Sequence, residues 1–234
     1  MSQKAPRQLI LDLVQEPKLG RDDFCVSPAN ADALALVDAW PRWPGKVLVL
    51  AGPEGAGKSH LARIWAGIAK AGFLAGRSLT AASIPAFAAC PAMVVEDADR
   101  LDGQEAQLFH LMNLLGESGG WLLLTARLRP DLWGLRIPDL VSRLRLAPCV
   151  EMAAPDDPLL RMVLAKHLAD RQLVIEPAVI DFIVLRMERS LAAASALAAA
   201  LDAEALEKSR PVTRKLAADV LARLQGGQQE IDFG

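Results

Sequence analysis

Three short apolar runs lie in the first part of the chain, and helical patterns separate them. The runs are Val47 to Leu50, Ala92 to Val95 and Trp121 to Leu124. A helical pattern from Asp32 to Trp40 precedes the first run, and another from Ser59 to Ala71 follows it. Uninterrupted apolar strands that alternate with helices are typical of parallel sheets covered on both faces. We therefore predict an α/β domain over residues 21–154.

The part of the chain from Pro155 onward shows helical patterns only. Its segments begin at residues that cap or open helices, such as Asp156, Pro177 and Thr213. The alanine-rich stretch from Leu191 to Leu206 carries leucines at helical spacing. These features predict a small all-helical domain over residues 155–225, and we expect a flexible C-terminus over residues 226–234.

The N-terminal segment, residues 1–20, differs from both of these parts. Pro6, Pro17 and Gly20 bracket a short alternating stretch with little helical periodicity. We therefore predict an extended tail. Its apolar stretch is too short for a signal peptide, and no long uncharged apolar segment follows it. A cytoplasmic protein without membrane contact is the expectation.

The composition narrows the function classes. With 52% hydrophobic residues, the chain of 234 residues can bury a sizeable core. Its formal net charge of −2 argues against a broad basic surface, so we expect any contact with DNA to be indirect. The three cysteines are far apart and form no CxxC pair, which argues against a disulfide framework or a zinc site.

The most specific motif follows the first apolar run. Residues 52–59 read Gly-Pro-Glu-Gly-Ala-Gly-Lys-Ser, a complete Walker A phosphate loop between a predicted strand and a predicted helix. Glycines let backbone N–H groups converge on phosphates, the lysine adds a positive charge, and the serine hydroxyl can ligate Mg²⁺. The sequence therefore predicts a site for ADP or ATP with Mg²⁺. The residues assigned to it here are Gly52, Pro53, Glu54, Gly55, Ala56, Gly57, Lys58, Ser59 and the adjacent His60.

Polar residues end the two later apolar runs. Glu96 and Asp97 stand where a Walker B acid belongs, so one can hold Mg²⁺ through water while the other polarises an attacking water. Thr125 can sense a γ-phosphate through its hydroxyl. Ligands of α/β sheets bind at the carboxyl ends of strands, so we assign these three residues to catalysis, and Ser59 and Glu96 to the metal. Solvated acids at a strand end are the alternative interpretation.

Other charged residues have two interpretations. Arg143 lies in the segment 137–144, from which a guanidinium can reach outward. It is either an arginine finger, which stabilises charge on phosphoryl oxygens at a neighbour's site, or one partner of a surface salt bridge. Asp99 and Arg100 are expected on a charged surface after the second strand.

Together, these motifs resemble the AAA+ proteins of the DnaA/Hda family over nearly the whole chain. The matching segments are the Walker A loop, Val94-Val95-Glu96-Asp97, Leu124-Thr125, Asp139 to Leu144 at the arginine-finger box, and Arg21 to Phe24 with Ser27 to Asn30. The resemblance implies that Phe24 and Val26 lie near the adenine, and that Arg189 of Arg189-Ser190-Leu191 senses the nucleotide from a helical lid. The chain ends where DnaA continues into a helix-turn-helix domain, which points to the Hda branch.

The tail extends this resemblance. Residues 8–13 read Gln-Leu-Ile-Leu-Asp-Leu and are similar to the peptide with which replication proteins dock into the sliding clamp. The resemblance implies that Gln8, Leu9, Leu11 and Leu13 bind the DNA polymerase III sliding clamp, its beta subunit; a leucine-rich edge strand is the alternative. Gln229 to Phe233 has a comparable layout but reads as a frayed end.

The resemblance implies a negative regulator of chromosomal replication initiation. A nucleotide, preferentially ADP, would hold the sheet and the lid together while the tail binds the DNA-loaded clamp. Arg143 would then enter the ATP site of DnaA and stimulate hydrolysis there. Glu96 departs from the aspartate of DnaA proteins, which fits a held nucleotide better than rapid turnover by this chain. An autonomous ATPase of helicase-loader type, an adaptor that sequesters DnaA without hydrolysis, and a homodimer all stay open.

Overall fold

The computed structural model describes residues 20–88, 90–208 and 210–231 of the chain. Gln8, Leu9, Leu11 and Leu13, which we predict to bind the clamp, lie outside the described residues. Among the residues described, every helix is too short or too polar to span a bilayer.

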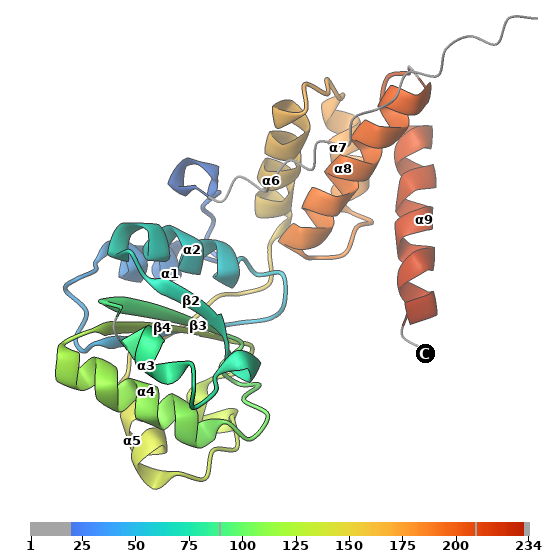
Figure 1. Ribbon diagram of the computed structural model, residues 1–234. Helices are drawn as coiled ribbons and strands as arrows, with labels where there is room; N and C mark the ends of the chain where they lie inside the picture. The colour runs from blue at the N-terminus through green and yellow to red at the C-terminus, as the bar shows by residue number, and fades with distance from the viewer. Residues whose placement is uncertain (1–19, 89, 209, 232–234) are drawn as a thin grey trace, which may run out of the picture.

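A five-stranded parallel sheet forms the centre of the first part of the chain, in the order β2-β3-β4-β1-β5 (Figure 1). The strands are β1 Val47–Ala51, β2 Gly72–Ala75, β3 Ala92–Glu96, β4 Trp121–Ala126 and β5 Cys149–Glu151. The predicted α/β fold is confirmed. β1 pairs with β4 on one side and β5 on the other, so the segment that follows β1 starts from inside the sheet.

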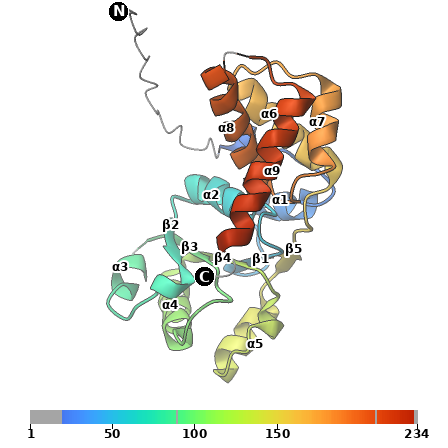
Figure 2. The same cartoon turned by 90° about the vertical axis from the view of Figure 1, so that its right-hand side faces the viewer.

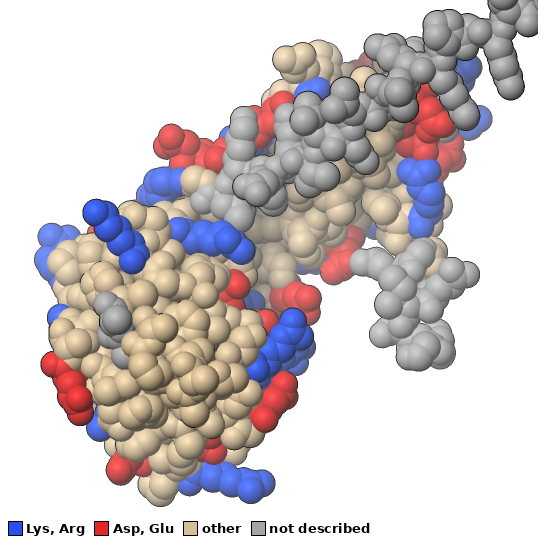
Figure 3. Space-filling model, in the orientation of Figure 1, with Lys and Arg blue, Asp and Glu red and all other residues tan. Residues whose placement is uncertain are grey.

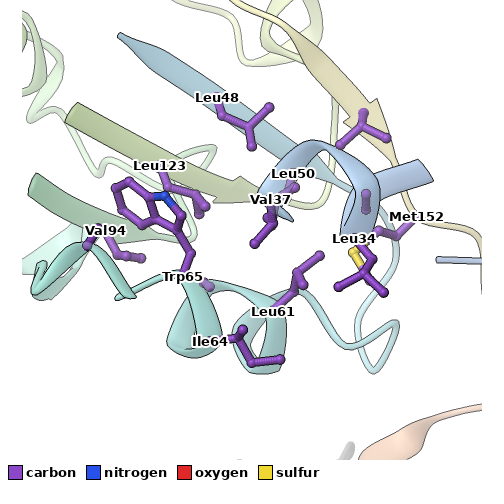
Figure 4. Close-up of a cluster of buried hydrophobic side chains, with 14 of the residues drawn as sticks. Leu34, Val37, Leu48, Leu50, Leu61, Ile64, Trp65, Val94, Leu123 and Met152 are labelled. Atoms are coloured by element: carbon purple, nitrogen blue, oxygen red, sulfur yellow. The ribbon is translucent and has the colours of Figure 1, made fainter. Parts of the chain in front are cut away.

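Helices cover both faces of this sheet (Figure 1). On one face lie α1 Ala31–Asp38 and α2 Lys58–Ala69; on the other lie α3 Ile84–Ala88, α4 Glu105–Ser118 and α5 Pro138–Leu146. Short 3-10 turns occupy Arg21–Asp23, Gly76–Ser78 and Pro130–Leu132. Side chains of β1 alternate between the two cores, because successive residues of a strand point to opposite faces. Leu48 and Leu50 pack with α1 and α2, as Figure 4 shows, and Val49 packs with α4 and α5.

Four tryptophans pack together beside the α2 face. Trp43 stacks on Trp65 of α2 with ring centroids 5.3 Å apart, and Trp40 and Trp121 meet them edge to face. The Nζ atom of Lys46 lies 3.8 Å from the Trp121 ring centroid. Aromatic pairs of this kind add to area burial, so they fasten α2 to the loop that precedes β1.

Four helices form the second part of the chain, with a hydrophobic core of their own. They are α6 Asp157–Asp170, α7 Pro177–Val184, α8 Leu191–Lys208 and α9 Arg214–Ile231. The predicted caps are present: Asp156 Oδ1 accepts the N–H of Leu159 at 2.8 Å, and Thr213 Oγ1 accepts that of Leu216 at 3.3 Å. α9 ends at Ile231, so the helix includes the first residues of the stretch from residue 226 that we predicted to be a flexible C-terminus.

The helices α6 to α9 and the helix α5 lie at opposite ends of the molecule in both ribbon views (Figure 2). The helical part sits over the end of the sheet where α2 begins. This arrangement separates the predicted phosphate loop from the predicted arginine finger.

Candidate nucleotide site

The phosphate loop joins β1 to α2 in a backbone conformation that needs glycine. Gly55 has φ 74° and Gly57 has φ 97°, in the region that L side chains rarely adopt. A Cβ atom at Gly55 would overlap the hydroxyl of Ser190, which stands at the start of α8. The helical part α6 to α9, which we predict to form the lid, therefore packs directly on the loop.

Lys58 is the first residue of α2, and its side chain is buried. Its Nζ atom donates to the carbonyl oxygens of Gly52 and Pro53, both at 2.7 Å. Burial lowers the pKa of Lys58, and the carboxylates of Asp97, Asp99 and Glu54 oppose that shift. The ammonium is thus held against the loop with little contact to water, where a phosphate oxygen would be a strong partner. Ser59, the next residue, is exposed.

The ends of three strands meet beside this loop. The backbone N–H of Asp97 donates to Thr125 Oγ1 at 3.2 Å, and that of Ala98 donates to the Thr125 carbonyl at 2.8 Å. The N–H of Gly52 donates to the Ala126 carbonyl at 3.2 Å. The structure therefore brings Glu96, Asp97 and Thr125 together with the phosphate loop. Thr125 is 1% exposed, and its hydroxyl accepts one N–H while keeping a proton to donate.

The donor set fits Mg²⁺. Glu96 Oε1 is buried and has no hydrogen-bond partner among the described residues, which is costly for a carboxylate unless a cation satisfies it. Within the described parts of the chain, no three His, Cys, Asp or Glu residues form a group that could hold a metal by themselves. Mg²⁺ commonly takes one or two protein oxygens together with substrate phosphates and water. Glu96 and Ser59 are the residues that would hold it.

Asp99 corrects one prediction. Its side chain is only 4% exposed, so the expectation of a surface position was wrong. The carboxylate turns back toward β4, where Oδ2 accepts the backbone N–H of Arg127 at 3.1 Å. Arg100 is exposed, as expected. Sequence reasoning missed Asp99 and Arg127 as site residues because nothing local links positions so far apart in the chain.

The side of the loop where we expect adenine is lined by Phe24 and His60. Their rings meet edge to face with centroids 5.2 Å apart, and His60 Nε2 lies 3.1 Å from the Gly20 carbonyl. Burial lowers the pKa of His60, so the imidazole is neutral at pH 7 and Nε2 donates to that carbonyl. Val26 is 44% exposed. Asn30 is buried and fixes the loop around Val26, since its Nδ2 donates to the Cys25 carbonyl at 3.0 Å.

A backbone hydrogen bond joins the lid to the phosphate loop. The N–H of Leu191 donates to the Gly55 carbonyl at 3.0 Å. Arg189, the predicted lid sensor, lies two residues before this contact and pairs through Nη2 with Asp157 Oδ1 of α6 at 2.8 Å. The structure thus places Arg189 at the junction of lid and loop with its guanidinium turned to another lid helix.

Arg143 lies at the other end of the sheet. Its Nη1 donates to Asn113 Oδ1 at 2.6 Å, and its guanidinium lies over the Phe109 ring, 5.2 Å from the centroid. It lines a groove of about 280 Å³ together with Val47, the first residue of β1, and Leu122, the second residue of β4. The phosphate loop follows the opposite end of β1, whose five residues span about 16 Å. Arg143 is exposed, and two side chains of α4 hold its guanidinium in place. It is therefore remote from the chain's own phosphate loop.

No protein-family model matches the chain, and no curated protein matches its sequence. Solved structures do match its fold. Domain III of the replication initiation protein DnaA from Thermotoga maritima superposes with a TM-score of 0.78 at 19% identity, covering 89% of this chain and 97% of that one. The chain has the fold of an AAA+ domain.

Two further AAA+ structures show the range of the likeness. AMPPCP-bound DnaA from Aquifex aeolicus has a TM-score of 0.71 at 17% identity, covering 92% of this chain and 71% of that one. The RuvB Holliday junction branch migration motor of Thermotoga maritima has a TM-score of 0.71 at 20% identity, covering 88% and 72%. The AAA+ fold expected from the sequence is thereby confirmed, with DnaA domain III among its structural neighbours.

Proposed function

We propose that this chain is a cytoplasmic, nucleotide-bound AAA+ regulator of the Hda kind, which restrains replication initiation by stimulating hydrolysis of the ATP on DnaA. The phosphate loop, the buried Lys58 and the acids at the strand ends support nucleotide binding. So does the likeness to a DnaA that binds AMPPCP. ADP or ATP with Mg²⁺ is the proposed ligand.

The position of Arg143 carries the proposal. A guanidinium separated from its own phosphate loop by the length of β1 cannot stabilise charge on its own nucleotide. The same side chain is exposed, and Asn113 and Phe109 orient it from α4. A preoriented arginine of this kind suits the charge that develops on phosphoryl oxygens in a neighbour's site. DnaA is the proposed neighbour.

The chain's own site then serves to hold a nucleotide. Ser59 and Glu96 would hold Mg²⁺, which would neutralise part of the charge of the phosphates. Lys58 and the loop N–H groups bind the phosphates, Phe24 and His60 border the base, and the Leu191 contact to Gly55 ties the lid to the occupied loop. The longer acid, Glu96, supports a holding role over rapid turnover.

Contact with DNA is proposed to run through the sliding clamp. On the face shown in Figure 3, Lys and Arg side chains are interspersed with Asp and Glu side chains around the α/β part. Such a surface is a poor match for a phosphate backbone, which needs clustered cations.

Replacing Gln8 and Leu9 with alanine is expected to weaken co-elution with the clamp, because the tail loses its rim hydrogen bond and one apolar anchor. Gel filtration of a mixture with the clamp measures this, and Gln15→Ala in the same segment is the matched control. Undiminished co-elution of the double variant would refute the assignment of this segment.

The decisive experiment follows the nucleotide on DnaA. DnaA loaded with radiolabelled ATP is incubated with this protein, with and without clamp loaded on DNA, and the bound nucleotide is separated after a time course. Conversion to ADP that needs both protein and clamp is the expected result. An adaptor that only sequesters DnaA would leave the ATP intact.

The likeness to the RuvB motor and the complete set of site residues favour a second candidate, an autonomous ATPase of helicase-loader type. Multiple turnovers of ATP by the isolated protein, without DnaA, would support it over the regulator.

A further inference from the structure

The segment Gly20–Phe24, called the entry segment below, is fixed to the α/β part of the chain through the helix α2. The Gly20 carbonyl lies 3.1 Å from His60 Nε2, which donates to it. The Phe24 ring is buried and meets the His60 ring edge to face, with the centroids 5.2 Å apart. His60 lies on the first turn of α2, so the entry segment is held beside the start of the phosphate-loop helix.

The same segment also reaches the helical part α6 to α9. Lys166 of α6 places its Nζ atom 2.9 Å from Asp23 Oδ1, and the two side chains are 31% and 19% exposed. The turn that carries Asp23 lies between α2 and α6 in both ribbon views (Figures 1 and 2). Among the ion pairs whose two side chains are both described, this pair alone joins the α/β part to the helical part.

A second contact between the two parts lies at the phosphate loop. The N–H of Leu191, the first residue of α8, donates to the Gly55 carbonyl at 3.0 Å. A Cβ atom at Gly57 would lie 3.1 Å from Leu191 Cδ1 and 3.9 Å from Phe24 Cε2. The phosphate loop, the helical part and the entry segment therefore meet around Gly57. A nucleotide whose phosphates occupy this loop would lie between the entry segment and α8.

We propose that the Asp23–Lys166 ion pair is a gate for the nucleotide: the two parts separate when it breaks, and a nucleotide enters and leaves while they are apart. Opening of a covering segment commonly limits the rate of ligand release. A partly exposed ion pair stabilises the closed state only modestly, so the pair can break without unfolding either part of the chain. The inference rests on the proposed function and deepens it, because slow release lets the chain hold its nucleotide.

Lys166→Gln is expected to raise the rate of ADP release and the rate of ADP association by the same factor, about fivefold. Both rates depend on the fraction of chains in the open state, so the dissociation constant should change little. A side chain that held the nucleotide directly would change mainly the release rate. Stopped-flow fluorescence of the full chain, with Mg²⁺ and ADP that carries a fluorescent label on its ribose, measures both rates.

Further variants isolate the pair. Asp23→Asn should raise both rates as Lys166→Gln does, and the double variant should be no faster than either single one, because the pair is already broken. Lys166→Arg should keep the rates of the wild type, since it restores the charge. Arg161→Gln is the matched control: Arg161 is an exposed cation of α6 that pairs with Asp181 inside the helical part, so its loss should leave both rates unchanged.

The possible outcomes separate this inference from the proposed function. If Lys166→Gln and Asp23→Asn bind and release ADP at the rates of the wild type, or release it faster without faster association, the ion pair is no gate. Thermal unfolding checks each variant, and Asp23→Asn carries the same test if Lys166→Gln does not fold. A wild-type chain that binds no nucleotide would overturn the proposed nucleotide binding together with the gate.

Discussion

Arg143→Ala is expected to lower the stimulation of hydrolysis on DnaA by about a thousandfold or more, with nucleotide and clamp binding unchanged. The guanidinium is the group that the proposal places in the partner's site, where it stabilises charge on the transferring phosphoryl group. Its loss leaves the phosphate loop intact, because that loop lies at the opposite end of β1. Single-turnover conversion of ATP on DnaA, with clamp on DNA, measures the effect.

Two variants sharpen this test. Arg145→Ala removes an exposed arginine from the same helix and should retain stimulation. Asn113→Ala keeps Arg143 but removes the amide oxygen that holds its Nη1, so it should reduce stimulation only about tenfold. If the Arg143 variant stimulates DnaA as well as the wild type does, the finger has no part in the mechanism.

Lys58→Ala is expected to weaken ADP and ATP binding by about a hundredfold or more. The ammonium is buried against the loop by its bonds to Gly52 and Pro53, so a bound phosphate would meet it with little competing water. Calorimetric titration with each nucleotide measures the loss, and thermal unfolding checks that the variant is folded.

Arg63→Ala is the control for Lys58. Arg63 is an exposed cation on the same helix, stacked on Phe73 with its Cζ 5.0 Å from the ring centroid. Its removal should leave the affinities unchanged. Similar dissociation constants for the Lys58 variant and the wild type would mean that this loop does not hold phosphates.

The sequence was informative where burial was complete. β1, β3 and β4 are continuous apolar runs because both of their faces are covered. Such runs can be recognised in the sequence without knowing which strands they pair with. β2 and β5 escaped notice for the opposite reason. β2 is an edge strand that is only half buried and starts with a glycine, and β5 has three residues with an exposed glutamate at its end. At the edge of a sheet, a strand forms because it pairs with its neighbour, and its amino-acid composition alone does not predict it.

The site shows the same division. The glycines, the lysine and the strand-end acids are local motifs, and the structure gathers them. The packing of Ser190 on Gly55 and the pairing of Asp99 with Arg127 join segments far apart in the chain, so only the fold reveals them. The distance of Arg143 from its own phosphate loop likewise depends on where α5 lies relative to the ends of β1.

The stacking of Trp43 on Trp65 gives the protein an optical reporter of its own. The chain has no tyrosine, so its near-ultraviolet emission is that of indole alone. Trp65 lies on α2, the helix that begins with Lys58, and Trp43 lies in the loop before β1. Any ligand that shifts that helix changes the coupling between the rings, and the change can be recorded on the unlabelled protein.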